Sequence, residues 1–216
     1  IMYDAEKDDR VAMANALAEE RDWPLIPSFD DAEIIAGQGT AMQELLREVG
    51  HVDALVLPVG GGGLISGSAL VSKVFSPEAQ IFGVEPAEAN DAQQSLEKGE
   101  IVTIPSPVTI ADGARVRSIT ELTFDLMKKN VDEIITASDD QIFTSMKLVA
   151  DRLKLVSEPT GVLGLAGVKT LVDEGKIARG SRVATVISGG NVDLDTFATC
   201  IASPDEAIKQ MQNWLS

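Results

Sequence analysis

The feature that most constrains the fold is a regular alternation of short apolar runs with longer amphipathic stretches. The amphipathic stretch at residues 138–153 begins with a capping box, Ser138 and Gln141, and repeats apolar residues on one helical face. The apolar runs are rich in branched residues and continuous, which is typical of strands buried on both faces. These predicted strands are residues 52–59, 79–85, 131–138 and 182–188. The β/α order predicts an α/β fold with a mainly parallel sheet and helices on both faces.

The first thirty residues are less regular. Residues 1–4 and the stretch "PLIPS" at 24–28 are predicted strands, and a helix is predicted from about Lys7 to Glu20. A chain that opens inside a βαβ unit is expected to be part of a longer polypeptide.

The stretch "FDD" at residues 29–31 marks a crossing into a new helix-rich pattern. We therefore expect residues 1–28 to be the end of a small domain and residues 29–216 to form a large domain. Near the C-terminus, Ser203 is the predicted cap of a further helix with Pro204 in its first turn.

Composition excludes several classes of site. The single cysteine, Cys200, excludes an internal disulfide and a cysteine metal cluster, and the single histidine, His51, argues against a His-dependent triad or a zinc site. No apolar run approaches the roughly 20 residues of a membrane span, and the first residues lack the regions of a signal peptide, so we expect a cytoplasmic protein with no membrane partner. A net charge of -16 repels nucleic acid and anionic lipid. An anionic ligand would have to be held by local backbone donors.

The stretch "LPVGGGGLISG" offers such donors. Gly60, Gly61, Gly62 and Gly63 lie between a predicted strand and a predicted helix, so backbone N–H groups lie at the positive end of that helix. Glycine has no Cβ to hold a phosphate away. The alternative is a flexible strand-to-helix turn, although one glycine suffices for that.

Two phosphate-bearing cofactors compete for this loop. Gly61, Gly63 and Gly67 imitate a dinucleotide fingerprint, with Glu85 closing the next strand as the ribose-binding acid of an NAD-dependent reductase. However, Ser66 occupies the place of the third fingerprint glycine.

A second glycine motif decides which phosphate-bearing cofactor the sequence favours. In "VATVISGGNVD", Ser188 and the glycines behind it follow a predicted strand, at the sheet edge where α/β proteins bind ligands. Alone this motif could be a capped turn. Together with "IIAGQGT", "PVGGGGLISG", "GVEPAEAND", "TIADGARV" and "SEPTGVLGLAG", the chain resembles the serine racemase and threonine/serine dehydratase family of fold type II pyridoxal-phosphate (PLP) enzymes, which are tryptophan synthase β-like. The likeness runs from the first residues to about Leu194.

The resemblance implies roles for particular residues. The glycine loop would bind the PLP phosphate, Ser188 would contact the pyridine nitrogen, and Gly113 and Glu158 would lie near the cofactor ring. For Glu158 an acid placed at a helix N-terminus by the helix dipole remains an alternative. The implied cofactor-binding residues are Gly60, Gly61, Gly62, Gly63, Leu64, Gly113 and Ser188.

The same resemblance implies a divalent cation site in "VEPAEAND". Its ligands would be the carboxylates of Glu85 and Asp91 and the main-chain carbonyl of Ala89, with waters completing the shell. Such oxygen donors suit Mg²⁺, Ca²⁺ or Mn²⁺. The alternative is an acidic, solvated loop formed by Glu85, Glu88 and Asp91.

The family's Schiff-base lysine and its substrate-carboxylate loop match nothing in this sequence. None of the ten lysines has the family's "FK" context, and the chain resembles roughly the last two thirds of a member, with the N-terminal part missing. The resemblance implies a homodimer that eliminates water and ammonia from a small 3-hydroxy amino acid such as L-serine, L-threonine or 3-hydroxyaspartate, and that also racemises serine. The short stretch after the "SGGN" motif favours the catabolic or racemase-like branch. A non-catalytic fragment that packs with a partner chain is a further alternative.

Overall fold

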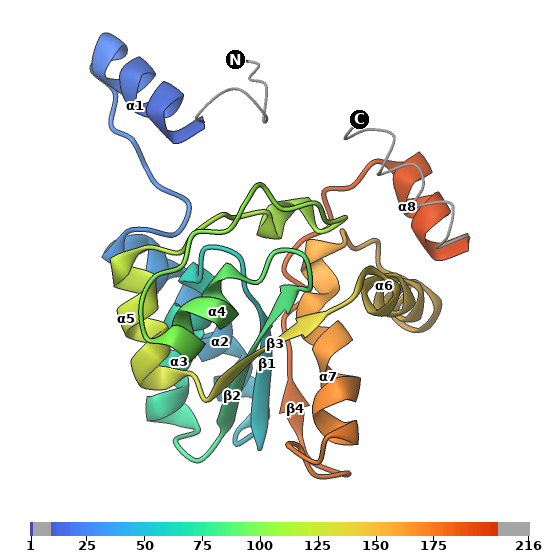
Figure 1. Ribbon diagram of the computed structural model, residues 1–216. Coiled ribbons are helices and arrows are strands. Elements are labelled where there is room, and N and C mark those ends of the chain that lie inside the picture. Colours follow the sequence, from blue (N-terminus) through green and yellow to red (C-terminus); the bar gives the residue numbers. More distant parts are fainter. Residues whose placement is uncertain (2–9, 203–216) are drawn as a thin grey trace.

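The computed structural model describes Ile1 and residues 10–202, which fold around one four-stranded sheet (Figure 1). The strand order is β3-β2-β1-β4, and all three strand pairs are parallel. The expectation of an α/β fold with a parallel sheet is confirmed. The strands are β1 (Ala54–Pro58), β2 (Gln80–Pro86), β3 (Glu133–Ala137) and β4 (Val183–Ala184).

Each predicted apolar run contains one of these strands, but β4 is much shorter than the predicted run at 182–188. Only Val183 and Ala184 pair with β1. Beyond them the chain approaches Gly164 in the first turn of a helix, where a Cβ would collide with the Thr185 hydroxyl. Ser188 therefore lies in an irregular segment that follows the strand.

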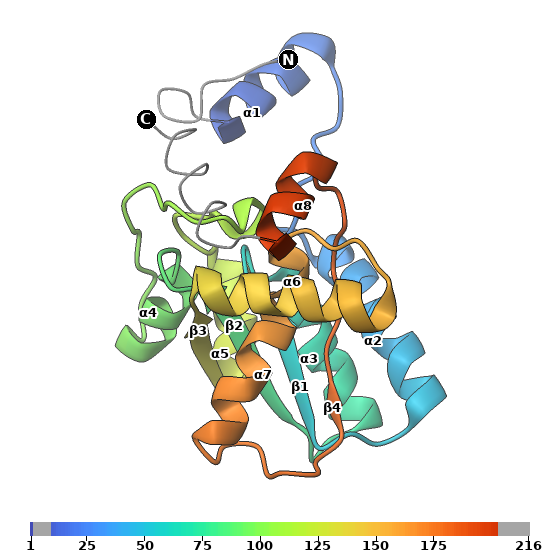
Figure 2. The same ribbon diagram turned by 90° about the vertical axis from the view of Figure 1, so that its right-hand side faces the viewer.

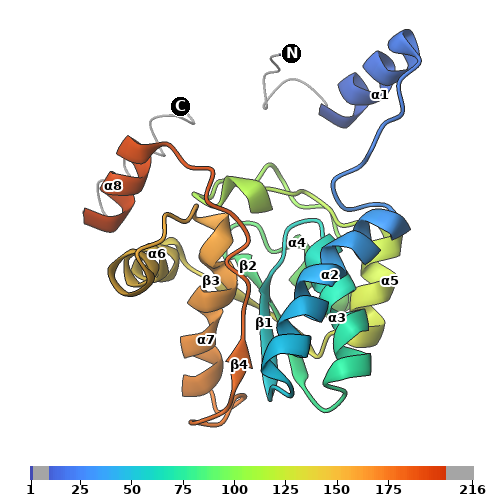
Figure 3. The ribbon, with the colours of Figure 1, turned by 180° about the vertical axis from the view of Figure 1, so that it is seen from behind.

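Helices cover both faces of the sheet, as predicted (Figures 1 and 3). In the part of the chain that the structure describes, no helix is both long and apolar enough to cross a membrane. One face carries α2 (Ala32–Val49), α3 (Gly63–Phe75) and α5 (Glu121–Asn130), with α4 (Asp91–Lys98) beside β3 and α5; the other carries α6 (Asp139–Leu153), α7 (Leu163–Asp173) and α8 (Leu194–Ala202). Two short 3₁₀ turns, η1 (Asp112–Ala114) and η2 (Thr160–Val162), lie in the connections.

Alternate residues of β1 pack into the two apolar clusters of the core, one on each face of the sheet. Leu55 and Leu57 pack with the residues of α2, α3 and α5, whereas Ala54 and Val56 pack with those of α6 and α7. All five residues of β1 are buried. This is why the sequence of this strand is continuously apolar rather than alternating.

The helix α6 begins where its capping box predicts. The Ser138 N–H donates to Gln141 Oε1 over 2.8 Å, and the Gln141 N–H donates to Ser138 Oγ over 3.4 Å. The reciprocal pair satisfies two N–H groups that the helix itself cannot bond.

The first described helix, α1 (Arg10–Arg21), lies away from the sheet layers and is joined to them by an extended segment (Figures 1 and 2). The predicted strand at 24–28 is wrong, since these residues pair with no described strand, and Leu25 and Ile26 are exposed. Pro24 and Pro27 provide no N–H donor for a ladder.

The predicted helix from about Lys7 to Glu20 is confirmed over the residues that α1 includes. Residues 2–9 and 203–216 lie outside the description, and with them most of the predicted strand at 1–4 and the helix capped by Ser203.

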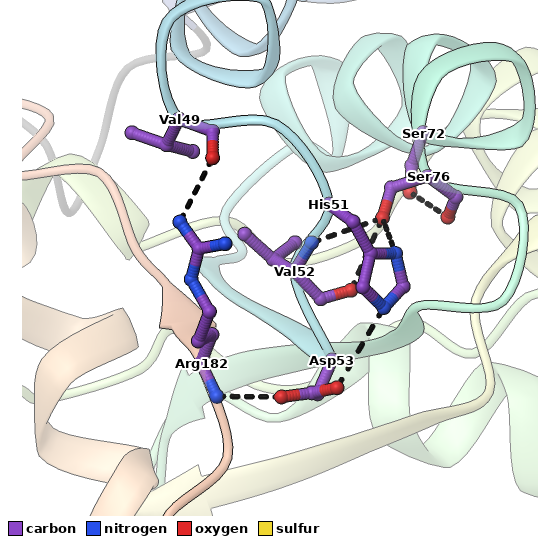
Figure 4. Close-up of polar contacts among 7 residues, drawn as sticks. All are labelled: Val49, His51, Val52, Asp53, Ser72, Ser76 and Arg182. Carbon is purple, nitrogen blue, oxygen red and sulfur yellow. Dashed lines mark hydrogen bonds and ion pairs between the residues drawn. The ribbon is translucent and has the colours of Figure 1, made fainter.

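A polar network closes the edge of the sheet where β1 begins (Figure 4). The buried Ser76 hydroxyl at the end of α3 accepts from the Val52 N–H over 3.2 Å, donates to the Val52 carbonyl over 3.1 Å and lies 2.9 Å from His51 Nδ1. His51 Nε2 is 3.6 Å from Asp53 Oδ1, and Asp53 Oδ2 accepts from the Arg182 N–H over 2.6 Å. Although a serine, a histidine and an aspartate meet here, the serine is inaccessible and bonded to backbone, so the network ties α3, β1 and β4 together.

Candidate cofactor site

The glycine loop lies where β1 ends and α3 begins, at the carboxyl edge of the sheet. Gly62 has φ +88°, in the left-handed region, and the helix starts at the next residue. A residue with a side chain is strained in that conformation. The N–H groups of the first turn of α3 have no partner within the helix, so the loop presents donors at the positive end of a helix dipole.

The walls of the loop explain why several positions exclude a side chain. A Cβ on Gly60 would lie 3.1 Å from the Gly113 carbonyl oxygen, and one on Gly63 would lie 2.8 Å from Gln38 Oε1. A Cβ on Gly61 would collide with the ring of Phe29. Packed protein atoms therefore leave these three positions no room for a Cβ, and the main-chain N–H donors of the loop fit a phosphate.

Gly67 has a different reason to be glycine. A Cβ there would collide with the Ile35 carbonyl oxygen and lie 2.8 Å from the Gly39 nitrogen, where α2 and α3 cross backbone to backbone. Gly67 is thus a helix-packing residue, one position beyond the place of the third fingerprint glycine, which Ser66 occupies.

A cleft of about 390 Å³ adjoins the glycine loop and brings two of the predicted residues together. Leu64, from the first turn of α3, and Ser188, from the segment after β4, both line it. The remaining lining residues are Gly37, Gln38, Ala41, Val186 and Ile187.

Glu158 lies against the second glycine motif. Its Oε2 accepts from the Asn191 N–H over 3.2 Å, and its own N–H donates to the Gly189 carbonyl over 3.1 Å. Burial raises the pKa of Glu158 above its ordinary value, and nearby Asp112 raises it further, while the bond from Asn191 opposes this. The carboxylate bond to Asn191 attaches Glu158 to the second glycine motif, and η2 begins two residues later at Thr160, so the cofactor role and the helix-dipole alternative both stay predictions.

Gly113 joins the two halves of this edge. Its N–H donates to Asp112 Oδ1 over 2.9 Å and to Thr160 Oγ1 over 3.0 Å, and its carbonyl faces Gly60. Thr160 in turn follows Glu158 by two residues. All the residues predicted for the cofactor therefore lie at one edge of the sheet.

The three predicted metal ligands lie together at the end of β2. The Glu85 carboxylate accepts from the Ala92 N–H over 3.1 Å and the Gln93 N–H over 2.8 Å, at the start of α4. Both carboxylate oxygens of Asp91 are buried and accept no hydrogen bond of ordinary length and angle among the described residues, although the N–H groups of Asp91 and Ile119 lie near enough to lower its pKa. The N–H of Ala89, also buried, donates to the Pro86 carbonyl over 2.9 Å.

Burial disfavours the charged form of each of these two acids. Burial raises the pKa of Glu85 to about 8, with the Asp91 carboxylate adding to the shift, and burial raises the pKa of Asp91 to about 7. Glu85 and Asp91 are each only 1% exposed, so the alternative of a solvated loop applies to Glu88 alone. No cluster of three or more His, Cys, Asp or Glu suited to a metal occurs among the described residues, but a site of two carboxylates and a main-chain carbonyl needs no third such side chain.

Two residues beside the glycine loop, Phe29 and Gln38, were not predicted from the sequence. Gln38 stands in the "IIAGQGT" motif, which marked it as part of a family pattern without giving its role. Phe29 stands in the "FDD" stretch, whose pattern indicates a crossing between domains and no contact with the glycine loop.

Together, the parallel sheet, the glycine loop and the cleft at its carboxyl edge define an α/β protein that binds a phosphate-bearing cofactor. The match to known proteins names the family: residues 1–189 match the family described as pyridoxal-phosphate dependent enzyme, and the chain belongs to it.

The sequence is also similar to individual characterised enzymes. The chain is 46% identical over 206 residues to the L-threo-3-hydroxyaspartate ammonia-lyase of Saccharomyces cerevisiae, covering 95% of the chain and 62% of that protein. It is 46% identical over 198 residues to the serine racemase of Schizosaccharomyces pombe, covering 92% and 60%. The chain thus spans about three fifths of the length of these relatives.

Solved structures show the same fold. The threonine deaminase from T.th. superimposes with a TM-score of 0.79 at 42% identity, covering 86% of this chain and 63% of that one. Maize serine racemase gives a TM-score of 0.83 at 39% identity, covering 92% and 62%. The expectation of a PLP enzyme fold is confirmed.

Proposed function

We propose that the protein carrying this chain is a PLP-dependent ammonia-lyase that acts on a 3-hydroxy amino acid such as L-serine, L-threonine or 3-hydroxyaspartate and releases a 2-oxo acid and ammonia. Racemisation of serine is a second outcome of the same loss of the Cα proton. The observation that carries the proposal is the glycine loop at the carboxyl edge of the sheet, in a chain of the PLP family. The relatives named as 3-hydroxyaspartate ammonia-lyase and serine racemase support this substrate class.

Each predicted residue has a task in this proposal. When bound, PLP supplies the electron sink that makes the Cα proton acidic. Residues 60–63 and the first turn of α3 hold the phosphate through backbone N–H groups. The Ser188 hydroxyl, which lines the cleft, would contact the ring nitrogen. Because a hydroxyl does not oblige that nitrogen to stay protonated, this contact would suit β-elimination and racemisation. Gly113 would lie near the ring, with its own Cβ direction occupied by Thr160, and Glu158 would fix the "SGGN" segment through Asn191.

We propose that the Schiff-base lysine lies outside the 216 residues of this chain. Lys73, Lys128, Lys129 and Lys154 are exposed. The proposed domain division, residues 1–28 and 29–216, places α1 and the extended segment in the small domain. The homodimer and the cytoplasmic location stay predictions.

We also propose a resident Mg²⁺, Ca²⁺ or Mn²⁺ bound by Glu85, Asp91 and the Ala89 carbonyl. The buried oxygens of Asp91, which accept no hydrogen bond of ordinary length and angle among the described residues, support this assignment, since a buried carboxylate is otherwise costly. The cation would neutralise two buried acids and fix the β2–α4 connection near the cofactor without joining the chemistry.

The test of the proposed function uses the purified protein that carries this chain, reconstituted with PLP. Incubation with L-serine, L-threonine or L-threo-3-hydroxyaspartate should release ammonia and a 2-oxo acid in equal amounts, and L-serine should also yield D-serine. L-Alanine, which has no β-hydroxyl group, is the control and should release neither. A protein that binds PLP yet releases no ammonia from any of the three hydroxy amino acids would contradict the proposal.

A further inference from the structure

The segment that leads into α2 lies against the glycine loop. The half-buried Phe29 ring occupies the direction that a Gly61 side chain would take. A Cβ on Gly63 would lie 3.0 Å from Phe29 Cβ and 2.8 Å from Gln38 Oε1. Two of the four loop glycines are therefore required by their contact with this segment, independently of any phosphate.

The segment is itself fixed to α2. Gln38 Nε2 donates to the Ser28 carbonyl over 2.9 Å. Asp31 Oδ1 accepts from the N–H groups of Glu33 over 2.8 Å and Ile34 over 3.1 Å, and so caps the helix. Phe29, between these two anchors, has little freedom to leave the loop.

We propose that Phe29 is a positioning residue that holds the glycine loop in its phosphate-binding shape before the cofactor arrives, with Gln38 as its support. The inference rests on the proposed function, in which this loop binds the PLP phosphate. Four successive glycines have more backbone freedom than any other four residues, and a loop that the phosphate alone had to order would bind it more weakly. The Phe29 ring removes part of that freedom from one side of the loop.

The first experiment compares Phe29→Ala with the unaltered protein in the full protein that carries this chain. Dissociation constants are measured for PLP and for pyridoxal, which lacks the phosphate. Phe29→Ala should raise the dissociation constant of PLP about tenfold, equivalent to about 1.4 kcal/mol of binding free energy. It should change the dissociation constant of pyridoxal less than about twofold.

Two further variants guard against simple loss of structure. Phe29→Leu keeps most of the apolar volume and should lose less PLP affinity than Phe29→Ala. Phe75→Ala removes a partly exposed phenylalanine at the far end of α3 and should leave the PLP dissociation constant unchanged.

The second experiment tests the contact itself through a double-mutant cycle. Gly61→Ala should weaken PLP binding strongly in the unaltered background, because its methyl group displaces the Phe29 ring. In the Phe29→Ala background the same substitution should reduce PLP affinity much less, because the space of the Phe29 ring is empty.

The outcomes separate the two proposals. Equal loss of PLP and pyridoxal affinity in Phe29→Ala, or an effect of Gly61→Ala that is the same in both backgrounds, would overturn the positioning role alone. An unaltered protein that binds PLP no more tightly than pyridoxal would overturn the phosphate-binding function and the positioning role with it.

Discussion

Gly62 and Gly175 have similar backbone conformations and very different surroundings. Their φ angles are +88° and +73°, both in the left-handed region. A Cβ on Gly62 would lie 2.8 Å from Met127 Cε, whereas a Cβ on Gly175 would meet nothing within 4 Å. The pair separates the cost of backbone strain from the cost of a collision between the glycine loop and α5.

We expect Gly175→Ala to lower the free energy of unfolding by about 1–2 kcal/mol, the cost of the left-handed conformation alone, and to leave PLP affinity unchanged. Gly62→Ala should cost more than this and should also weaken PLP binding. Urea unfolding and a PLP titration of both variants check the two effects. Undiminished PLP affinity in Gly62→Ala would remove the loop from the phosphate site.

At Asp91, we expect Asp91→Asn to abolish stabilisation by Mg²⁺. In the unaltered protein, Mg²⁺ at about a hundred times its dissociation constant should raise the free energy of unfolding by about 2.7 kcal/mol. In chelator, Asp91→Asn should be at least as stable as the unaltered protein, because an amide has no buried charge facing Glu85. Thermal unfolding with and without Mg²⁺ measures both differences.

Glu88→Gln provides the matched control, since Glu88 is an exposed acid of the same loop. It should keep the full response to Mg²⁺. If Asp91→Asn also kept it, the proposed ligand set would be incorrect.

Sequence motifs predicted the residues whose role depends on local backbone, such as Gly62, Ser188 and Glu158, and the structure gathers them at one edge. Phe29 escaped prediction because its partner, Gly61, is about thirty residues away along the chain. No local period or motif encodes that contact. It exists only after α2 and α3 have packed.

At the scale of elements, the Ser76 network fixes the end of α3 to the start of β1 (Figure 4). We expect Ser76→Ala to lower the free energy of unfolding by about 1–3 kcal/mol, because the buried Val52 N–H loses its bond to the hydroxyl. PLP affinity should not change, since the glycine loop lies at the opposite end of α3. Denaturant unfolding and a PLP titration check both statements.

Ser106→Ala, at an exposed position, is the control and should stay within about 0.5 kcal/mol of the unaltered protein. A loss in Ser76→Ala no larger than in Ser106→Ala would show that the network contributes little.

The strands of the sheet centre were predictable because burial on both faces leaves a continuous apolar run, as in β1. The strand predictions at 24–28 and at the end of 182–188 failed, because an apolar run there does not reflect burial between two layers of helices. Residues 24–28 are apolar and extended, yet no described strand lies beside them. In the run at 182–188, periodicity cannot reveal that pairing with β1 stops after Ala184, since that depends on the position of α7.

At the scale of the whole molecule, the charge of the chain opposes its proposed cofactor. The net charge is -16, and PLP is an anion. Long-range repulsion acts on approach, whereas the backbone donors of the loop act only at short range.

We therefore expect the association rate of PLP to rise by roughly two- to fivefold as ionic strength increases from about 0.01 to 0.15 M, because salt screens the repulsion. Pyridoxal, without the phosphate, should respond much less. Stopped-flow absorbance measures both rates. A PLP rate that falls with salt would mean that local positive charge outweighs the field of the chain.

The backbone crossing of α2 and α3 at Gly39 and Gly67 has a consequence for any survey of tolerated substitutions. Neither position has room for a methyl group, and the atoms in the way are main-chain atoms that cannot rotate aside. A saturation-mutagenesis map scored by growth would therefore mark both as intolerant as the loop glycines, although neither would touch the cofactor. A screen that scores protein abundance separately from activity would distinguish these two packing glycines, at the contact between α2 and α3, from the glycines of the cofactor loop.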